Sequence, residues 1–191
     1  TINTPPTASL TVSGGAVRIG DGSSGTFFEV GRRSVTATNT ATLTGTATFT
    51  NATSVAIDVD AARIGVVAGA GSIAKGDVFL SNVGDNRLRA NSLTIGDSDN
   101  PGATSVTSSL RLGSGVNTLN VDDVYVARRK ANGTVTIVAG GTLTLGGRDQ
   151  ATANLFVAHN DSNGTGALSV GNFNLSAGTL NATLNNVIIA R

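Results

Sequence analysis

Residues 123–146 read DVYVARRKANGTVTIVAGGTLTLG. The runs Val124-Tyr125-Val126-Ala127 and Leu143-Thr144-Leu145-Gly146 share one pattern, which is an apolar residue, a variable residue, an aliphatic residue and a small residue. Alternation with period two indicates a short strand whose first and third side chains face a core. The small fourth residue indicates a bend, where a side chain would be crowded or φ turns positive.

The same four-residue pattern recurs from one end of the chain to the other. It also occupies residues 17–20, 28–31, 62–65, 78–81, 93–96, 110–113, 155–158, 168–171 and 187–190. The chain is therefore expected to be a series of very short strands separated by tight turns.

The sequence also repeats with a longer period, which contains several copies of the four-residue pattern. Asp123–Arg128, Asn154–His159 and Asn186–Arg191 have the same form, so a copy begins at positions 123, 154 and 186. Between these copies, Asn132-Gly133-Thr134 aligns with Asn163-Gly164-Thr165. One period of about 31 residues therefore holds three strands and three turns.

A three-strand unit of this length cannot bury its own apolar side chains, but stacked units can, with about 4.8 Å between neighbouring strands. The repeat predicts an all-β protein, a three-sided parallel β-helix (β-solenoid) of about six coils. Residues 1–191 would form one solenoid domain, which could belong to a longer solenoid, and residues 1–7 an extended linker. Short strands separated by turns also fit an antiparallel sandwich, which is the alternative.

The composition excludes several other classes. Glu29 is the only Glu and Gln150 the only Gln, so a helical protein would lack most of its usual residues. The net charge of +1 with scattered Arg predicts no nucleic-acid partner. Without Cys there is no disulfide framework, and no apolar stretch is long enough for a transmembrane segment.

The repeat text also resembles a known class of sequence. Residues 124–146, and a second copy over residues 155–178, are similar to the autotransporter-associated β-strand repeats of large bacterial surface and secreted proteins. The similarity is clearest over residues 78–191. It implies a right-handed parallel β-helix in an extracellular or cell-surface location, with a structural or adhesive role.

Two outward-facing sets of residues are candidate sites. Aligning residues 77–82 (DVFLSN) as an earlier copy predicts an apolar stripe of Phe79, Tyr125, Phe156 and Ile188. Such a stripe can bind a glycan by stacking, pack under a loop, contact another protein or simply stabilise the sheet. The second set, a polar ladder, consists of Arg128, His159 and Arg191.

The polar ladder is the one enzymatic candidate, because a polysaccharide lyase or hydrolase would use such residues together with Tyr125. The simpler interpretation is that each ladder residue begins a solvated turn. Asp123 aligns with Asn154 and Asn186, so the repeat supplies no second carboxylate for acid and base catalysis. We therefore expect no catalytic residues and no enzyme activity.

Two acidic loops are weak candidates for calcium. Asp97 and Asp99 lie in residues 97–102, and Asp161 lies in residues 160–164. Both loops lack the distal Glu of an EF-hand, and Asx turns explain their composition equally well. The sequence therefore predicts neither a metal nor any other cofactor.

The two ends of the chain carry complementary parts of one coil. Ala8–Gly20 aligns with Gly133–Gly146, which are the second and third strands of a period, and Asn186–Arg191 aligns with a first strand. We therefore expect head-to-tail association with other copies, into a filament or surface layer. The alternative function is a carbohydrate-binding or polysaccharide-cleaving β-helix, with glycans or the cell envelope as partners.

Overall fold

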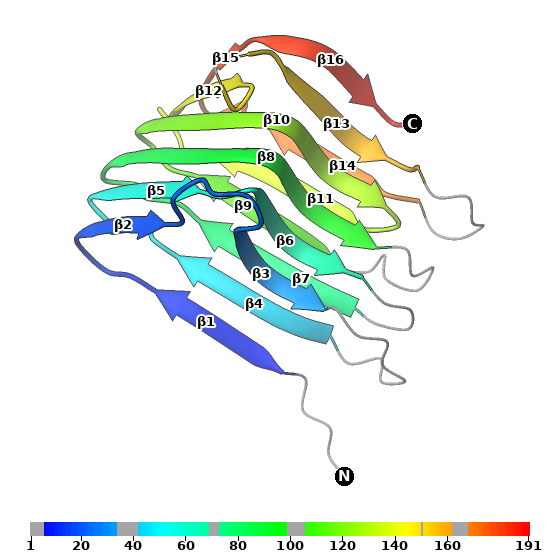
Figure 1. The fold of residues 1–191 in the computed structure, drawn as a ribbon, viewed down its shortest axis with the longest axis horizontal. Helices are drawn as coiled ribbons and strands as arrows, with labels where there is room; N and C mark the ends of the chain where they lie inside the picture. The colour runs from blue at the N-terminus through cyan, green and yellow to red at the C-terminus, as the bar shows by residue number, and fades with distance from the viewer. Residues whose placement is uncertain (1–5, 34–41, 69–72, 99–105, 150, 162–167) are drawn as a thin grey trace.

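The computed structural model describes residues 6–33, 42–68, 73–98, 106–149, 151–161 and 168–191. These residues form strands and turns, with no helix among them, so the protein is all-β as predicted (Figure 1). The strands are β1 (Thr7–Thr11), β2 (Ala16–Ile19), β3 (Phe27–Arg33), β4 (Thr42–Thr48), β5 (Ser54–Asp58), β6 (Ala61–Val67), β7 (Ile73–Phe79), β8 (Asp85–Ser98), β9 (Thr107–Leu112), β10 (Val116–Arg129), β11 (Asn132–Ile137), β12 (Thr142–Gly146), β13 (Ala153–His159), β14 (Val170–Asn174), β15 (Thr179–Ala182) and β16 (Leu184–Ile189).

All of the strand pairings among the described residues are parallel, and each joins strands from successive stretches of the chain. One sheet has the order β1-β4-β7-β9-β11-β14. The other sheet contains two series of paired strands, β2-β5-β8-β10-β12-β15 and β3-β6-β8-β10-β13-β16. The long strands β8 and β10 belong to both series and join them into one sheet. Parallel stacking of this kind is compatible with a β-solenoid and rules out the antiparallel sandwich.

Several paired strands have the predicted separation of residues, but the separation is not constant along the chain. Asn86 pairs with Asn117, and Asp123 pairs with Asn154, each at a separation of 31 residues. The separation varies in both sheets. Asn132 pairs with Val170, 38 residues later, but with a much nearer residue, Thr107, on its other side. In the second sheet, Asn117 pairs with Leu143, which is also nearer than one predicted period.

The predicted alignment of Asn132-Gly133-Thr134 with Asn163-Gly164-Thr165 is therefore wrong. Extra residues between β13 and β14 move the paired strand to 170–174. Residues 163–165 themselves lie outside the described part of the chain.

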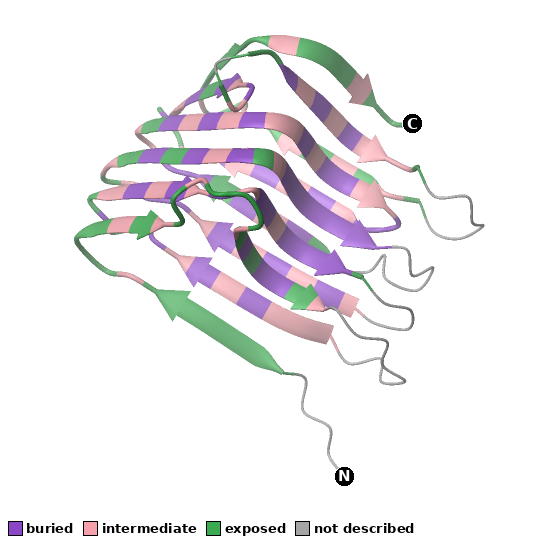
Figure 2. Cartoon of the chain, in the orientation of Figure 1, coloured by how far each residue is buried: buried purple, intermediate pink, exposed green. Residues whose placement is uncertain are grey.

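The core lies between the sheets and consists of stacked aliphatic side chains. Ile57, Leu88, Leu119 and Leu145 are paired in successive strands, and each is at most 1% exposed. Full burial of one such side chain contributes about 1.5–3 kcal/mol. Buried and partly exposed residues alternate along the interior strands, whereas β1 and β15 at the two ends are exposed throughout (Figure 2). Each strand therefore needs a paired strand on both sides to bury its inward apolar side chains fully.

The predicted bend after the third residue of the repeat is present at one corner of the fold. There the backbone has φ between 54° and 73°, in the left-handed region that L-residues rarely adopt. A crossing strand approaches closely, because a Cβ added to Gly133 would lie 2.6 Å from the backbone nitrogen of Ala127. The corner residues are Gly31, Gly65, Gly96, Ala127, Ala158 and Ala190.

The prediction that Thr7 belongs to an extended linker is wrong. Thr7 is already part of β1, and the carbonyl oxygen of Pro6 accepts a hydrogen bond from the Thr44 backbone nitrogen. Residues 1–5 lie outside the described part of the chain. None of the described residues form a helix that could cross a membrane.

Candidate interaction surfaces

The structure brings three of the four predicted stripe residues together. Tyr125 in β10 pairs with Phe156 in β13, and Phe156 pairs with Ile188 in β16. The side chains are outward and partly exposed. Phe79 does not belong to this stripe, because it lies in β7 of the other sheet and pairs with Thr48 and Arg111. The prediction for Phe79 is wrong because residues 77–82 were matched to a strand on a different face.

The rings of the stripe contact one another. The Tyr125 and Phe156 rings are stacked, with centroids 4.6 Å apart and planes 9° from parallel. The Arg128 guanidinium carbon lies 4.7 Å from the centroid of the Tyr125 ring, and the His159 ring is tilted against Phe156 at 5.0 Å. Aromatic and cation–π contacts of this kind stabilise the fold. They also leave little of the Tyr125 ring face free to stack on a sugar.

The environment of Tyr125 favours its neutral form. Its pKa is raised above the ordinary value because burial disfavours the phenolate, and because the Asp123 carboxylate repels it. Tyr125 is therefore poorly suited to act as a base near neutral pH.

The polar ladder is present, and its first arginine is ion-paired. Arg128 pairs with His159 in the strand register. Arg191 follows the next strand, β16, and its backbone nitrogen donates a hydrogen bond to the Ala158 carbonyl oxygen at 3.3 Å. The Arg128 side chain contacts Asp161 at 2.6 Å. His159 has a buried Nδ1 with no hydrogen-bond partner among the described residues.

Two of the three calcium candidates, Asp97 and Asp161, contact arginine side chains. Asp97 is buried and accepts a hydrogen bond from the Arg129 Nε at 2.5 Å. Burial acts to raise the pKa of Asp161, but the Arg128 guanidinium outweighs it and lowers that pKa below the ordinary value. Both carboxylates therefore already face a cation. Asp99 lies outside the described residues, within which His, Asp and Glu form no group of three that could hold a metal.

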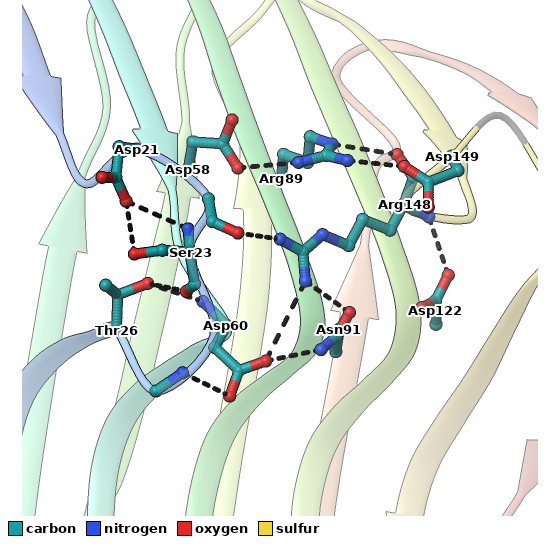
Figure 3. A network of polar contacts seen from close by, with 12 residues as sticks. Asp21, Ser23, Thr26, Asp58, Asp60, Arg89, Asn91, Asp122, Arg148 and Asp149 are labelled. Atoms are coloured by element: carbon teal, nitrogen blue, oxygen red, sulfur yellow. Dashed lines mark hydrogen bonds and ion pairs between the residues drawn. The ribbon is translucent and has the colours of Figure 1, made fainter.

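A polar network that was not predicted from the sequence joins side chains of neighbouring strands and loops (Figure 3). Arg89 in β8 contacts Asp58 at 3.2 Å and Asp149 at 2.5 Å. Asp58 and Arg89 are paired in adjacent strands and are separated by 31 residues. Aligning the outward residues on the predicted period would therefore have revealed this ion pair.

Arg148 joins two loops that are far apart in sequence. Its Nη2 donates to the Gly22 carbonyl oxygen at 2.6 Å, and its Nη1 donates to the Asn91 side chain at 2.6 Å. Its backbone nitrogen donates to Asp122 at 2.8 Å. The loop after β12 is thereby fastened to the loop between β2 and β3, 126 residues away. We call this arrangement the corner clamp.

The two ends of the parallel strand stack are exposed cross-sections of the core. Leu180, Val187 and Ile189 are 43%, 53% and 70% exposed, although their partners one strand inward, Leu143, Leu155 and Val157, are buried. At the other end Leu10 is 51% exposed, and a cleft between β1 and β3 is lined by Leu10, Phe28, Val30 and Ala47. Within the described residues, β1 and β16 each pair with a single strand. The two ends therefore expose apolar side chains at positions that are buried in the neighbouring strands.

Comparison with known proteins assigns no family. No protein-family model, curated protein or solved structure matches this chain. The resemblance to autotransporter-associated repeats stays a prediction from sequence, and the functional argument depends on the fold and its surfaces.

Proposed function

We propose that the chain is an extracellular structural or adhesive β-solenoid protein that associates end to end with copies of itself. In this proposal the parallel strands form a three-sided β-helix of about six coils, with a period of about 31 residues. The grouping is supported by three series of six strands each, in which β8 and β10 serve two series. The extracellular location is supported by the resemblance of residues 124–146 to repeats of bacterial surface proteins.

The exposure of core positions at the ends carries the proposal. Leu180, Val187 and Ile189 occupy the same inward columns as buried side chains of the neighbouring strands. Leaving them in water forfeits about 25 cal/mol for each Å² of apolar surface that a partner would cover. Within the described part of the chain, β14, β15 and β16 each pair on one side only, so a further parallel strand would satisfy the backbone groups of their outer edges.

The alternative, a carbohydrate-binding or carbohydrate-cleaving protein, has less support. A stacking platform needs free ring faces, but the Tyr125 ring contacts both Phe156 and Arg128. A catalytic centre needs an oriented acid or base, but His159 makes no hydrogen bond through Nδ1 within the described residues. We therefore propose a structural role for the stripe and the polar ladder, and an interaction role for the ends.

The test is the mass of the purified chain over a range of concentrations, measured by light scattering after size exclusion. We expect the mass to rise with concentration, and Ile189→Asp to abolish the rise. Val83→Asp is the matched control, since Val83 is 67% exposed but lies in a turn away from the ends. A wild-type chain that stays monomeric at high concentration contradicts the proposal.

A further inference from the structure

We infer that the loop of residues 20–26 and the loop of residues 147–149 open and close together, as one strap across the strands between them. The corner clamp joins the two loops, so loosening the second loop releases the first across three intervening strands. The inference depends only on contacts within the chain, and it is independent of any association between copies.

The two loops follow strands that are not neighbours. Residues 20–26 follow β2, and residues 147–149 follow β12. Along the series β2-β5-β8-β10-β12 these strands are four steps apart, which is about 19 Å at about 4.8 Å for each step. In stacked repeats each unit contacts only its nearest neighbours. A bond between these loops therefore adds a coupling that the stacking of the strands does not supply.

Gly22 is held from two sides. Its backbone nitrogen donates to the carbonyl oxygen of Asp58 in the neighbouring strand at 2.9 Å, and its own carbonyl oxygen accepts a hydrogen bond from Arg148 Nη2 at 2.6 Å. The backbone nitrogen of Gly25 donates to the Asp60 carboxylate at 3.3 Å. Figure 3 shows the Arg148 side chain lying across the strands between the two loops. The loop of residues 20–26 is therefore fastened both to its neighbouring strand and to the distant arginine.

The Arg148 side chain is nearly buried, with 11% of its surface exposed. Its Nη1 donates to the Asn91 side-chain oxygen at 2.6 Å and lies 3.9 Å from the Asp60 carboxylate. A nearly buried cation that loses the Gly22 carbonyl oxygen is left with an unsatisfied donor, which is unfavourable. Opening of residues 20–26 therefore favours release of Arg148, and release of Arg148 in turn favours opening, since coupling is reciprocal.

Asp122 in β10 positions Arg148. Its carboxylate accepts a hydrogen bond from the Arg148 backbone nitrogen at 2.8 Å, and within the described residues it forms no hydrogen bond with residues 20–26. Arg89 supports the same loop, because its Nε donates to the Arg148 carbonyl oxygen at 3.3 Å. Asp122 is therefore a positioning residue, whose effect on residues 20–26 passes through Arg148.

Hydrogen exchange of the full chain, resolved by amide, tests the coupling in Asp122→Ala. We expect the Gly22 and Gly25 amides to exchange about five times faster than in the wild type, which corresponds to the loss of one hydrogen bond. The amides of residues 86–90 in the intervening β8 should keep their protection. Asp122→Asn keeps an oxygen acceptor for the Arg148 nitrogen, so its exchange should match that of the wild type.

The matched control is Asp123→Ala, which removes the neighbouring carboxylate of the same strand. Asp123 accepts a hydrogen bond from the Asn154 side chain at 2.8 Å instead, so its removal should leave the exchange of residues 20–26 unchanged. Circular dichroism of each variant establishes that it is folded. Unchanged exchange of residues 20–26 in Asp122→Ala, or equal acceleration in the two alanine variants, overturns the inference.

Asp21→Ala tests the same coupling from the other loop, and it also serves if Asp122→Ala does not fold. The Asp21 carboxylate accepts hydrogen bonds from the Ser23 backbone nitrogen at 3.0 Å and from the Ser23 hydroxyl at 2.6 Å, so its removal loosens residues 20–26. We expect severalfold faster exchange of the Arg148 amide. Faster exchange at Ser23 with unchanged exchange at Arg148 would contradict joint opening of the loops.

Discussion

The side-chain nitrogen of Asn86 donates a hydrogen bond to the side-chain oxygen of Asn117 at 2.9 Å, between two strands in the core. Both residues are at most 2% exposed. Each also closes its own turn: Asn86 bonds the backbone nitrogen and oxygen of Ser81, and Asn117 bonds those of Gly113. These amides therefore replace aliphatic residues in their column while satisfying backbone groups that would otherwise be buried without partners.

Removal of this amide should destabilise the fold. Asn117→Leu leaves the backbone groups of Gly113 and one donor of Asn86 unsatisfied, at about 1–3 kcal/mol for each buried group. Urea unfolding should show this loss even though Leu143 occupies the next position of the same column. Asn120→Ala, an outward change in the same strand, should alter stability by less than about 0.5 kcal/mol. Equal losses of stability for the two variants would show that the buried Asn86–Asn117 hydrogen bond has no special role.

Two glycines with positive φ, Gly65 at the corner and Gly15 in the turn between β1 and β2, should differ sharply in their tolerance of alanine. Gly65 has φ of 64°, and an added Cβ would lie 1.7 Å from the Ser108 Oγ. Gly15 has φ of 69° but no atom within 4 Å of that position. Gly15→Ala should cost about 1–2 kcal/mol for the left-handed conformation alone, and Gly65→Ala considerably more. Thermal unfolding measures the difference, and similar midpoints would contradict the close approach at this corner.

The stripe should be a source of stability. In a double-mutant cycle of Tyr125→Ala and Phe156→Ala, we expect a coupling of about 0.5–1.5 kcal/mol, since the stacked rings contact each other directly. A glycan array should show no binding that either substitution removes. Negligible coupling, together with glycan binding lost in Tyr125→Ala, would favour the carbohydrate-binding alternative.

Loss of the corner clamp should open one loop locally. Arg148→Met removes the side-chain bonds to Gly22 and Asn91, so hydrogen exchange in residues 20–26 should become faster while the core strands keep their protection. Arg87→Met is the control, because Arg87 is an exposed arginine of β8. Unchanged exchange in residues 20–26 of the Arg148 variant would mean that the clamp does not hold the loop.

The Arg128–Asp161 pair should make stability depend on acidic pH. Because the pKa of Asp161 is lowered in the folded protein, the pair contributes fully above the ordinary pKa of an aspartate. That contribution, at most about 1 kcal/mol for such a partly exposed pair, is lost as pH falls through the lowered folded value. Asp161→Asn should therefore reduce stability at neutral pH and flatten this part of the pH profile. An unchanged profile would contradict the pairing.

The four-residue repeat predicted the strands and the small corner residue, because alternation and crowding leave direct traces in the sequence, and the longer repeat predicted the parallel stacking. It did not predict which face a strand occupies. Val78-Phe79-Leu80-Ser81 has the same pattern as Val124-Tyr125-Val126-Ala127, and only the register places Phe79 and Tyr125 in different sheets. Short modules in different sheets are interchangeable by pattern, so the spacing through irregular loops decides the assignment.

The polar features were harder to predict for a different reason. Asn86 and Asn117 stand at positions that are aliphatic elsewhere in the column, so their pattern does not distinguish a buried amide from an outward one. Arg148 reaches Gly22 through the conformations of two loops, which no periodicity encodes. The Asp58–Arg89 pair could have been found, because the two residues are one predicted period apart.

Cryo-electron microscopy of the wild-type chain at high concentration tests the central claim most directly. With the six coils that we propose, each rising about 4.8 Å, end-to-end stacking predicts filaments with continuous strand density and an axial repeat of about 29 Å per molecule. Single particles of monomer size at every concentration, or assemblies in which the edges of β14–β16 remain exposed, would contradict it.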